Sequence, residues 1–340
     1  MILTVTLNAA LDVTYQVAEL QPGGSTRVRT VAERAGGKGV NVSRVLRTLG
    51  VATEVTGLAG GLTGRALRAD LARSGLADFL VPVARESRRT VAVVDERAGE
   101  TSILLEPGPE VSTAEWRAFT GSYRARLARA KTVVLSGSLP RGLPADAYAL
   151  LLYHARLAGV PAVLDTEGEP LLAALRERPA LIKPNAHELT ATTGCSDPLE
   201  AIAQLRTAGA RAVVASLGPD GLLAVSPEGR WRAAPPHPVA GNPTGAGDAA
   251  VAALAVGLTS GSPWPEVLAR AVALSAAAVA APLAGSYDAA LYRSLREQVS
   301  VTPLTEPDPL APHDPTPHRP APHRPAPHGA TPTEGLPPCP

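Results

Sequence analysis

NPTGAGD, residues 242–248, leads directly into an apolar run that predicts a helix. Gly245 and Gly247 allow consecutive backbone N–H groups to face outward at the helix start, where free donors and the helix dipole stabilise an anion. Asp248, in the first turn, can face that anion and accept a proton from a hydroxyl. A donor cradle beside one carboxylate suits phosphoryl transfer, which depends on positioning and charge stabilisation. The alternative is a capped helix with Thr244 as N-cap, in which Asp248 only complements the dipole.

A second glycine-rich stretch, AGGKGVN at residues 35–41, also precedes an expected helix. Its glycines permit close approach of a ligand, Lys38 supplies a point charge, and Asn41 offers both donors and acceptors. The stretch contains neither the Gly-Lys-Ser/Thr of a P-loop nor the Gly-x-Gly-x-x-Gly of a dinucleotide site. A simple glycine turn before a helix remains the alternative.

Two further polar stretches follow apolar strands. In KPNAHE, residues 183–188, Asn185 and Glu188 stand three apart at a helix start. A carboxylate there can orient the waters of Mg²⁺ around phosphates, because magnesium keeps much of its hydration shell. The same spacing fits a capping box equally well. The stretch SLGPDG, residues 216–221, also lies at a strand end, and a turn before the next hairpin explains it without a ligand.

The chain around these motifs alternates between apolar strands and helices. Strands are expected at 131–136, 160–165, 181–183 and 212–216, and helices at 145–158, 170–177 and from 245 to about 281. Continuous apolar strands separated by helices indicate an α/β fold with a mostly parallel sheet covered on both faces. Ligands bind beyond the carboxyl ends of such strands, which is where the polar motifs lie.

Two regions depart from this alternation. Strand-like stretches at 13–17, 27–31, 89–94 and 101–105 predict a small separate sheet, which we call the lid (about residues 13–33 and 88–106). The Pro- and His-rich stretch 303–340 predicts a disordered tail without a catalytic role, which leaves residues 1–302 as one folded domain. A metal site on the tail histidines is the alternative.

The composition excludes several classes of partner. The chain has 32 Lys and Arg against 31 Asp and Glu, a net charge of +1. This balance gives no electrostatic reason to expect binding to nucleic acid or to an anionic membrane. The longest apolar stretch, residues 271–284, is too short to span a bilayer. We therefore expect a soluble cytoplasmic protein.

Taken in order, the motifs resemble those of the PfkB, or ribokinase-like, carbohydrate kinases. Within that family they resemble the branch of 1-phosphofructokinases, tagatose-6-phosphate kinases and minor 6-phosphofructokinases. The resemblance covers residues 4 to about 295 and rests on TLNAALDVTY, AGGKGVNVSRVLRTLG, LSGSLPRGLP, LDTEGEPL, LIKPNAHEL, VASLGPDGLL and PTGAGDA. It implies a ribokinase-like three-layer α/β/α fold with a β-sheet lid, the use of ATP and Mg²⁺, and a phosphorylated ketohexose as substrate.

The resemblance also implies roles for individual residues. Asp248 would be the general base, and the amides around Gly245, Ala246 and Gly247 would form the anion hole. Glu188 would organise Mg²⁺ through water. The nucleotide would be bound by Lys183, Asn185, Ser216, Gly218, Gly221 and Asn242. The sugar would be bound by Asp12, Gly37, Lys38, Asn41, Arg88, Ser138 and, from the lid, Arg27, with Lys38 and Arg88 holding the substrate's own phosphate.

Departures from the branch leave the identity of the sugar open. The sequence Asn8-Ala9-Ala10 replaces the usual Asn-Pro-Ala, and Thr26 stands where asparagine is common. Fructose 1-phosphate is the first expectation and tagatose 6-phosphate or fructose 6-phosphate the alternative. A sensor of sugar phosphates without catalysis is opposed by the intact Asp248, and a nucleoside kinase by the scarcity of aromatic residues. The exposed edges and apolar face of a small lid predict a homodimer.

Overall fold

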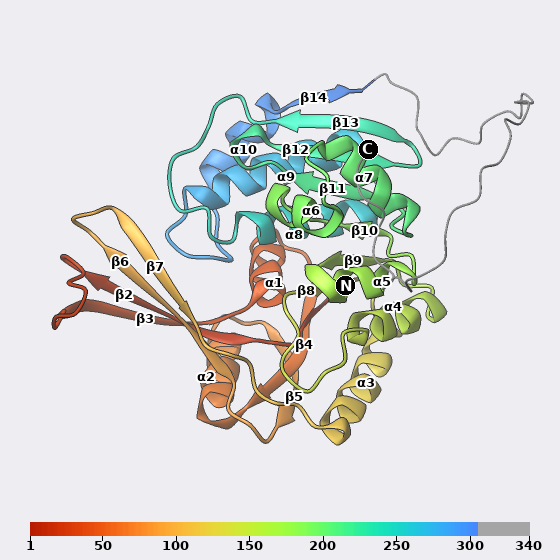
Figure 1. Cartoon of the computed structure of the whole chain (residues 1–340). Helices are drawn as coiled ribbons and strands as arrows, with labels where there is room; N and C mark the ends of the chain where they lie inside the picture. The colour runs from red at the N-terminus through yellow and green to blue at the C-terminus, as the bar shows by residue number, and fades with distance from the viewer. Residues whose placement is uncertain (305–340) are drawn as a thin grey trace, which may run out of the picture.

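A ten-stranded β-sheet organises the computed structural model, which describes residues 1–304 (Figure 1). From β11 to β5 all neighbouring strands run parallel, whereas β12, β13 and β14 continue the sheet in antiparallel fashion. The order across the sheet is β14 (Ser300–Pro303), β13 (Gly229–Ala234), β12 (Leu222–Ser226), β11 (Val213–Ser216), β10 (Leu181–Ile182), β9 (Ala162–Asp165), β8 (Thr132–Ser136), β1 (Ile2–Thr6), β4 (Thr53–Gly60) and β5 (Ala77–Val83).

Helices cover both faces of this sheet, so the architecture is the expected three-layer α/β/α fold. One face carries α1 (Lys38–Thr48), α8 (Ala246–Ser260), α9 (Trp264–Val279) and α10 (Ala289–Gln298). The other carries α3 (Thr113–Leu127), α4 (Ala147–Leu157), α5 (Gly168–Leu175), α6 (Ala186–Thr193) and α7 (Pro198–Thr207).

Alternation along the strands divides the apolar core between these two layers. Ile2 packs with α1, α8 and α9, whereas its neighbour Leu3 packs with the helices of the opposite face. Val133 and Val134 of β8 divide in the same way. Successive strand residues point to opposite faces, so an all-apolar strand must be buried on both sides.

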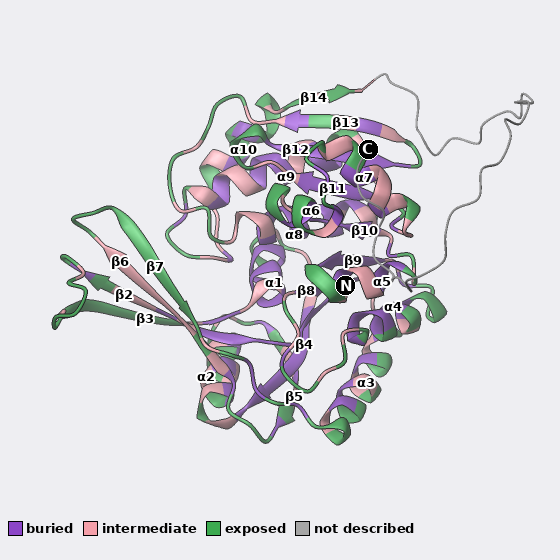
Figure 2. Cartoon of the chain, in the orientation of Figure 1, coloured by how far each residue is buried: buried purple, intermediate pink, exposed green. Residues whose placement is uncertain are grey.

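The lid is a separate four-stranded sheet in the order β3 (Val28–Gly36), β2 (Ala10–Val17), β6 (Arg88–Asp95) and β7 (Glu100–Leu105). It projects from the body beside α2 (Gly61–Arg73), and its far part is largely exposed (Figures 1 and 2). The outer pairs are antiparallel, but β2 and β6 run parallel. The lid base packs on α2 through a third apolar cluster that includes Leu11, Val13, Leu67 and Leu71.

The strands and helices expected from the sequence are confirmed, and the structure adds others, among them β4, β5, α2, α3, α7, α10 and a last strand at the end of the domain. Pro303 closes β14 opposite Trp231, and the Leu304 amide donates to the Arg230 carbonyl at 3.0 Å. The sheet thus continues into the first residues that the sequence assigned to the tail. Pro303 is tolerated because β14 is an edge strand. The rest of the expected tail lies outside the described residues, and within residues 1–304 no helix has the length and apolarity to cross a membrane.

Candidate active site

A cavity of about 900 Å³ lies between the carboxyl ends of the parallel strands, the lid base and the starts of α1 and α8. Most of the residues singled out from the sequence meet there, although they come from distant parts of the chain. Those that line it are Asp12, Gly37, Lys38, Asn41, Arg88, Lys183, Asn185, Glu188, Ser216, Gly218, Gly221, Gly245, Ala246, Gly247 and Asp248.

Three expected site residues lie outside this lining. Ser138 lines a smaller neighbouring cavity of about 140 Å³. Asn242 stabilises the loop that precedes α8, because its Oδ1 accepts a hydrogen bond from the Thr244 amide at 3.0 Å. Arg27 is exposed at the far end of the lid, just before β3, and touches neither cavity.

The start of α8 has a geometry that suits an anion. Gly245 is the N-cap and has a φ of 88°, and a Cβ there would lie 2.8 Å from the Ala284 Cα. Only glycine fits such a left-handed, closely packed position. The first amide to bond back within the helix is that of Ala249, to the Gly245 carbonyl at 2.9 Å. The Ala246 amide, expected in the anion hole, donates instead to the Pro243 carbonyl at 3.1 Å, whereas the amides of Gly247 and Asp248 precede Ala249 at the positive end of the helix. The alternative with Thr244 as N-cap is therefore wrong.

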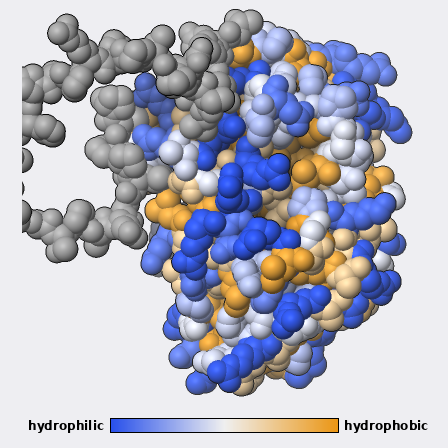
Figure 3. All heavy atoms as spheres, turned by 90° about the vertical axis from the view of Figure 1, so that its right-hand side faces the viewer, coloured by the Kyte–Doolittle hydropathy of each residue, from blue (hydrophilic) through white to orange (hydrophobic). Residues whose placement is uncertain are grey.

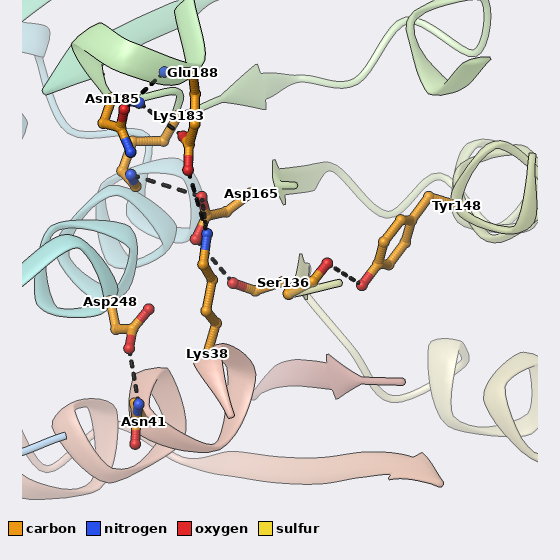
Figure 4. A network of polar contacts seen from close by, with 10 residues as sticks. Lys38, Asn41, Ser136, Tyr148, Asp165, Lys183, Asn185, Glu188 and Asp248 are labelled. Atoms are coloured by element: carbon orange, nitrogen blue, oxygen red, sulfur yellow. Dashed lines mark hydrogen bonds and ion pairs between the residues drawn. The ribbon is translucent and has the colours of Figure 1, made fainter. Parts of the chain in front are cut away.

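Asp248 combines the burial and the proton affinity of a general base. Its carboxylate is buried and accepts a hydrogen bond from Asn41 Nδ2 at 2.9 Å (Figure 4). Burial, together with the neighbouring carboxylate of Asp165, raises the pKa of Asp248 to about 7, although Asn41, Lys38 and Lys183 act in the opposite direction. A base with a pKa near the working pH is the best placed to take a proton at that pH.

Asp165, at the end of β9, interacts with three polar side chains of the site, although the sequence did not single it out. Its buried carboxylate lies 3.5 Å from Lys38 Nζ and 3.6 Å from Lys183 Nζ, and it accepts from Ser136 Oγ at 3.0 Å (Figure 4). Burial alone would raise the pKa of Asp165, but the two ammonium groups hold it below its ordinary value. The stretch LDTEGEPL pointed to this place without identifying which residue acts.

Lys38 points toward the carboxylates and not along the cavity toward Arg88. Besides Asp165, its Nζ lies 3.7 Å from Glu188 Oε1 (Figure 4). Burial lowers its pKa, yet the surrounding carboxylates more than compensate and hold the pKa of Lys38 above its ordinary value. Its charge therefore lies beside the start of α8. The charge of Lys183 lies there too, because its Nζ would be 3.5 Å from a Cβ at position 247.

Asn185 and Glu188 form the capping box that the sequence left as an alternative. The Asn185 amide donates to Glu188 Oε2 at 2.9 Å, and the Glu188 amide donates to Asn185 Oδ1 at 2.8 Å. Only one carboxylate oxygen is used in this way, since Oε1 faces Lys38 and the cavity. Capping and ligand binding are therefore compatible at Glu188.

The opposite end of the cavity is formed by the lid base. In the parallel register of β2 and β6, Asp12 lies opposite Thr90 and Ala10 opposite Arg88. The Arg88 Nε donates to the Asn8 carbonyl at 3.1 Å. Burial raises the pKa of Asp12 to about 6, which Arg88 and Thr90 partly offset. This end therefore offers a guanidinium and a carboxylate side by side, as recognition of a phosphate and a hydroxyl requires.

Comparisons with known proteins agree with this geometry. The family described as pfkB family carbohydrate kinase matches residues 5–289. A 1-phosphofructokinase of Xanthomonas campestris is 38% identical over 279 residues, which cover 79% of this chain and 87% of that protein. Phosphofructokinase-2 of Escherichia coli, solved in complex with potassium, superposes with a TM-score of 0.81 at 29% identity over 87% of this chain and 98% of that one. A possible 1-phosphofructokinase of Thermotoga maritima gives a TM-score of 0.81 at 25% identity over 90% and 100% of the two chains.

Proposed function

Because the chain belongs to the pfkB family of carbohydrate kinases, we propose that it transfers the γ-phosphoryl group of ATP to a hydroxyl of a ketohexose monophosphate. The observation that carries this proposal is one cavity with two different ends. One end has a buried carboxylate of pKa about 7 beside the free amides of α8, and the other has Arg88 and Asp12.

The chemistry follows from where the charges lie. Asp248 takes the proton of the sugar hydroxyl, whose oxygen then bonds to the γ-phosphorus as the bond from that phosphorus to the β-phosphate oxygen breaks. The amides of Gly247 and Asp248, with Lys183 and Lys38 beside them, stabilise the negative charge of the transferred group. We therefore assign Lys38 to the transferred phosphoryl group, in place of the substrate's own phosphate.

The nucleotide would occupy the part of the cavity that the sequence assigned to it. Ser216, Gly218 and Gly221 line that part together with apolar Val272, Ala276 and Val279, which suit an adenine base. Asn242 supports the loop at its edge. Bound Mg²⁺ would neutralise the phosphates, and Glu188 Oε1, which lies outside the capping box and 3.7 Å from Lys38 Nζ, could accept hydrogen bonds from its waters.

Fructose 1-phosphate is the substrate we propose first, and tagatose 6-phosphate or fructose 6-phosphate is the alternative. Asp12, Gly37 and Asn41 would bind the sugar, and Arg88 with Ser138 its phosphate. The test is kcat/KM with MgATP for these three phosphosugars and for unphosphorylated fructose. Preference for one phosphosugar supports the proposal, whereas preference for free fructose contradicts the assignment of Arg88. Binding of sugar phosphate without any ADP release would instead indicate a sensor.

We further propose that two copies associate through their lids. Val31 of β3 and Leu104 of β7 are 57% and 58% exposed, and the register of the strands places them on the same face of the lid. A second lid would cover both this surface and the open strand edges. Arg27 lines neither cavity of its own chain, so we propose that it would contact substrate only in the cavity of the partner copy.

The mass in solution tests this assembly. We expect a dimer for the unmodified chain and a monomer for Leu104→Glu. The matched control is Leu157→Glu, since Leu157 of α4 is 64% exposed on the opposite side of the molecule. On that face the apolar residues form patches separated by hydrophilic side chains (Figure 3). A monomeric unmodified chain would overturn the proposal.

A further inference from the structure

Asn8 links the two residues that would hold the substrate's phosphate. It follows β1 and is 9% exposed. Its backbone carbonyl accepts from Arg88 Nε at 3.1 Å, and its side-chain Nδ2 donates to Ser138 Oγ at 3.1 Å. One buried residue thus contacts both Arg88, from the start of β6, and Ser138, from the loop after β8.

Asn8, Arg88 and Ser138 meet at the cavity of about 140 Å³, which adjoins the main cavity through Gly37, Lys38 and Arg88. A cavity needs only about 10–15 Å³ to admit one water, so this one has room for a larger polar group. Glu167 is exposed in its lining, while the ammonium of Lys38 is turned away to Asp165 and Glu188. Arg88 is therefore the cation available to an anion in this cavity.

The two hydrogen bonds of Asn8 determine what its partners can offer. A serine hydroxyl has one donor and two acceptor positions. Because Ser138 Oγ accepts from the Asn8 amide, its own proton remains available for an anion. The bond from Arg88 Nε to the Asn8 carbonyl fixes the plane of the guanidinium, so that the remaining N–H groups keep a constant direction.

We infer that Asn8 is a positioning residue for recognition of the substrate's phosphate: its side chain holds Ser138 as a hydrogen-bond donor, while its backbone carbonyl, which any residue at this position would keep, fixes the orientation of Arg88. This inference rests on the proposed function. It assigns to Asn8 a role in discriminating phosphorylated from unphosphorylated ketoses, and no direct part in the transfer of the phosphoryl group.

Substitution of Asn8 tests the inference, with KM measured for fructose 1-phosphate and for fructose. Asn8→Ala removes the bond to Ser138 and should raise KM for the phosphosugar about tenfold with little change in kcat. Asn8→Asp should be more severe, because a carboxylate accepts the Ser138 proton and turns the serine away from donating. KM for fructose should stay within about twofold for both variants, since fructose lacks the phosphate.

A double-mutant cycle separates this role from a general loss of structure. In a Ser138→Ala background, Asn8→Ala should have no further effect on KM. The matched control is Thr56→Val, which removes the hydrogen bond from the buried Thr56 Oγ1 to the Phe79 carbonyl at 2.9 Å, away from both cavities. It should lower Tm comparably and leave the phosphosugar preference intact.

The outcomes are distinguishable from failure of the proposed function. If the unmodified chain shows no preference for a ketohexose phosphate, the proposed function fails. If it does show that preference, the inference on Asn8 is overturned by equal KM increases for both sugars or by additive effects of Asn8→Ala and Ser138→Ala.

Discussion

Asp165 should control the pH at which Asp248 becomes a base, and Asp165→Asn tests this. In the unmodified chain the pKa of Asp248 is about 7, so the base is present above that pH and is protonated below it. About a tenth of the molecules would have an ionised Asp248 at pH 6 and about nine tenths at pH 8. The rate should therefore fall about tenfold between pH 8 and pH 6.

The magnitude of the change follows from the causes of the raised pKa. Burial is the largest of them and the charge of Asp165 the next, so its removal should lower the pKa of Asp248 by on the order of one unit. The two lysines that Asp165 holds would then act on Asp248 in the same direction. With a pKa near 6, about half of the molecules would be ionised at pH 6, and the fall between pH 8 and pH 6 shrinks to about twofold.

The assay is the initial rate from pH 5.5 to 9 with both substrates well below saturation, each profile divided by its own maximum. Phosphates of the substrates also titrate near pH 6, but they do so equally for both proteins. Asp78→Asn is the control, because Asp78 pairs with Arg68 on the lid side of the body, away from the cavity. Identical inflections for the unmodified chain and Asp165→Asn would refute the coupling.

Three further predictions concern other parts of the chain. Asp248→Asn should reduce kcat by about 10²–10⁴ while ATP binding, measured by calorimetry, is retained. Because folding raises the pKa of Asp248, the same change should also raise Tm at pH 8, and this gain in Tm should disappear as the pH falls from 7 toward 4. Gly245→Ala should lower stability by about 1–3 kcal/mol in denaturant unfolding and abolish turnover, whereas Gly121→Ala, in open space on α3, should do neither. A chain ending at Leu304 should keep its kcat/KM, but one ending at Gln298 loses β14 and should unfold at lower temperature; loss of activity in the first would contradict the expectation for the tail.

Much of this site could be predicted because its chemistry is local in the sequence. The glycines of 245–247 and Asp248 form one motif, and parallel strands place such motifs at a common edge. The direction of a long side chain could not be predicted, since it depends on charges from other motifs. Lys38 turns toward Asp165 and Glu188, which lie more than a hundred residues away in the chain. Asp165 itself looks like any polar residue after an apolar strand until Lys38, Lys183 and Ser136 surround it.

The boundary predicted between the folded domain and the tail, at residue 303, differs from the structure for another reason. Proline content argues against a strand, and that argument holds for central strands, where every N–H is needed. At the edge β14 pairs with one neighbour only, and Pro303 stands at its last position. Whether a strand lies at the edge depends on the order of strands in the sheet, so the composition of the segment alone could not predict it.

The lid does more than cover the cavity, because the parallel pairing of β2 with β6 builds the sugar end of it. Asp12 lies on β2 and Arg88 opens β6, and the register places Ala10 opposite Arg88 and Asp12 opposite Thr90. Side chains two apart on a strand share a face, so Asp12, Arg88 and Thr90 all point to the cavity that they line. A slip of one residue would turn the members of one strand to the opposite face. The bond from Arg88 to the Asn8 carbonyl therefore acts at the point where this register begins, and it ties substrate recognition to the pairing of the lid strands.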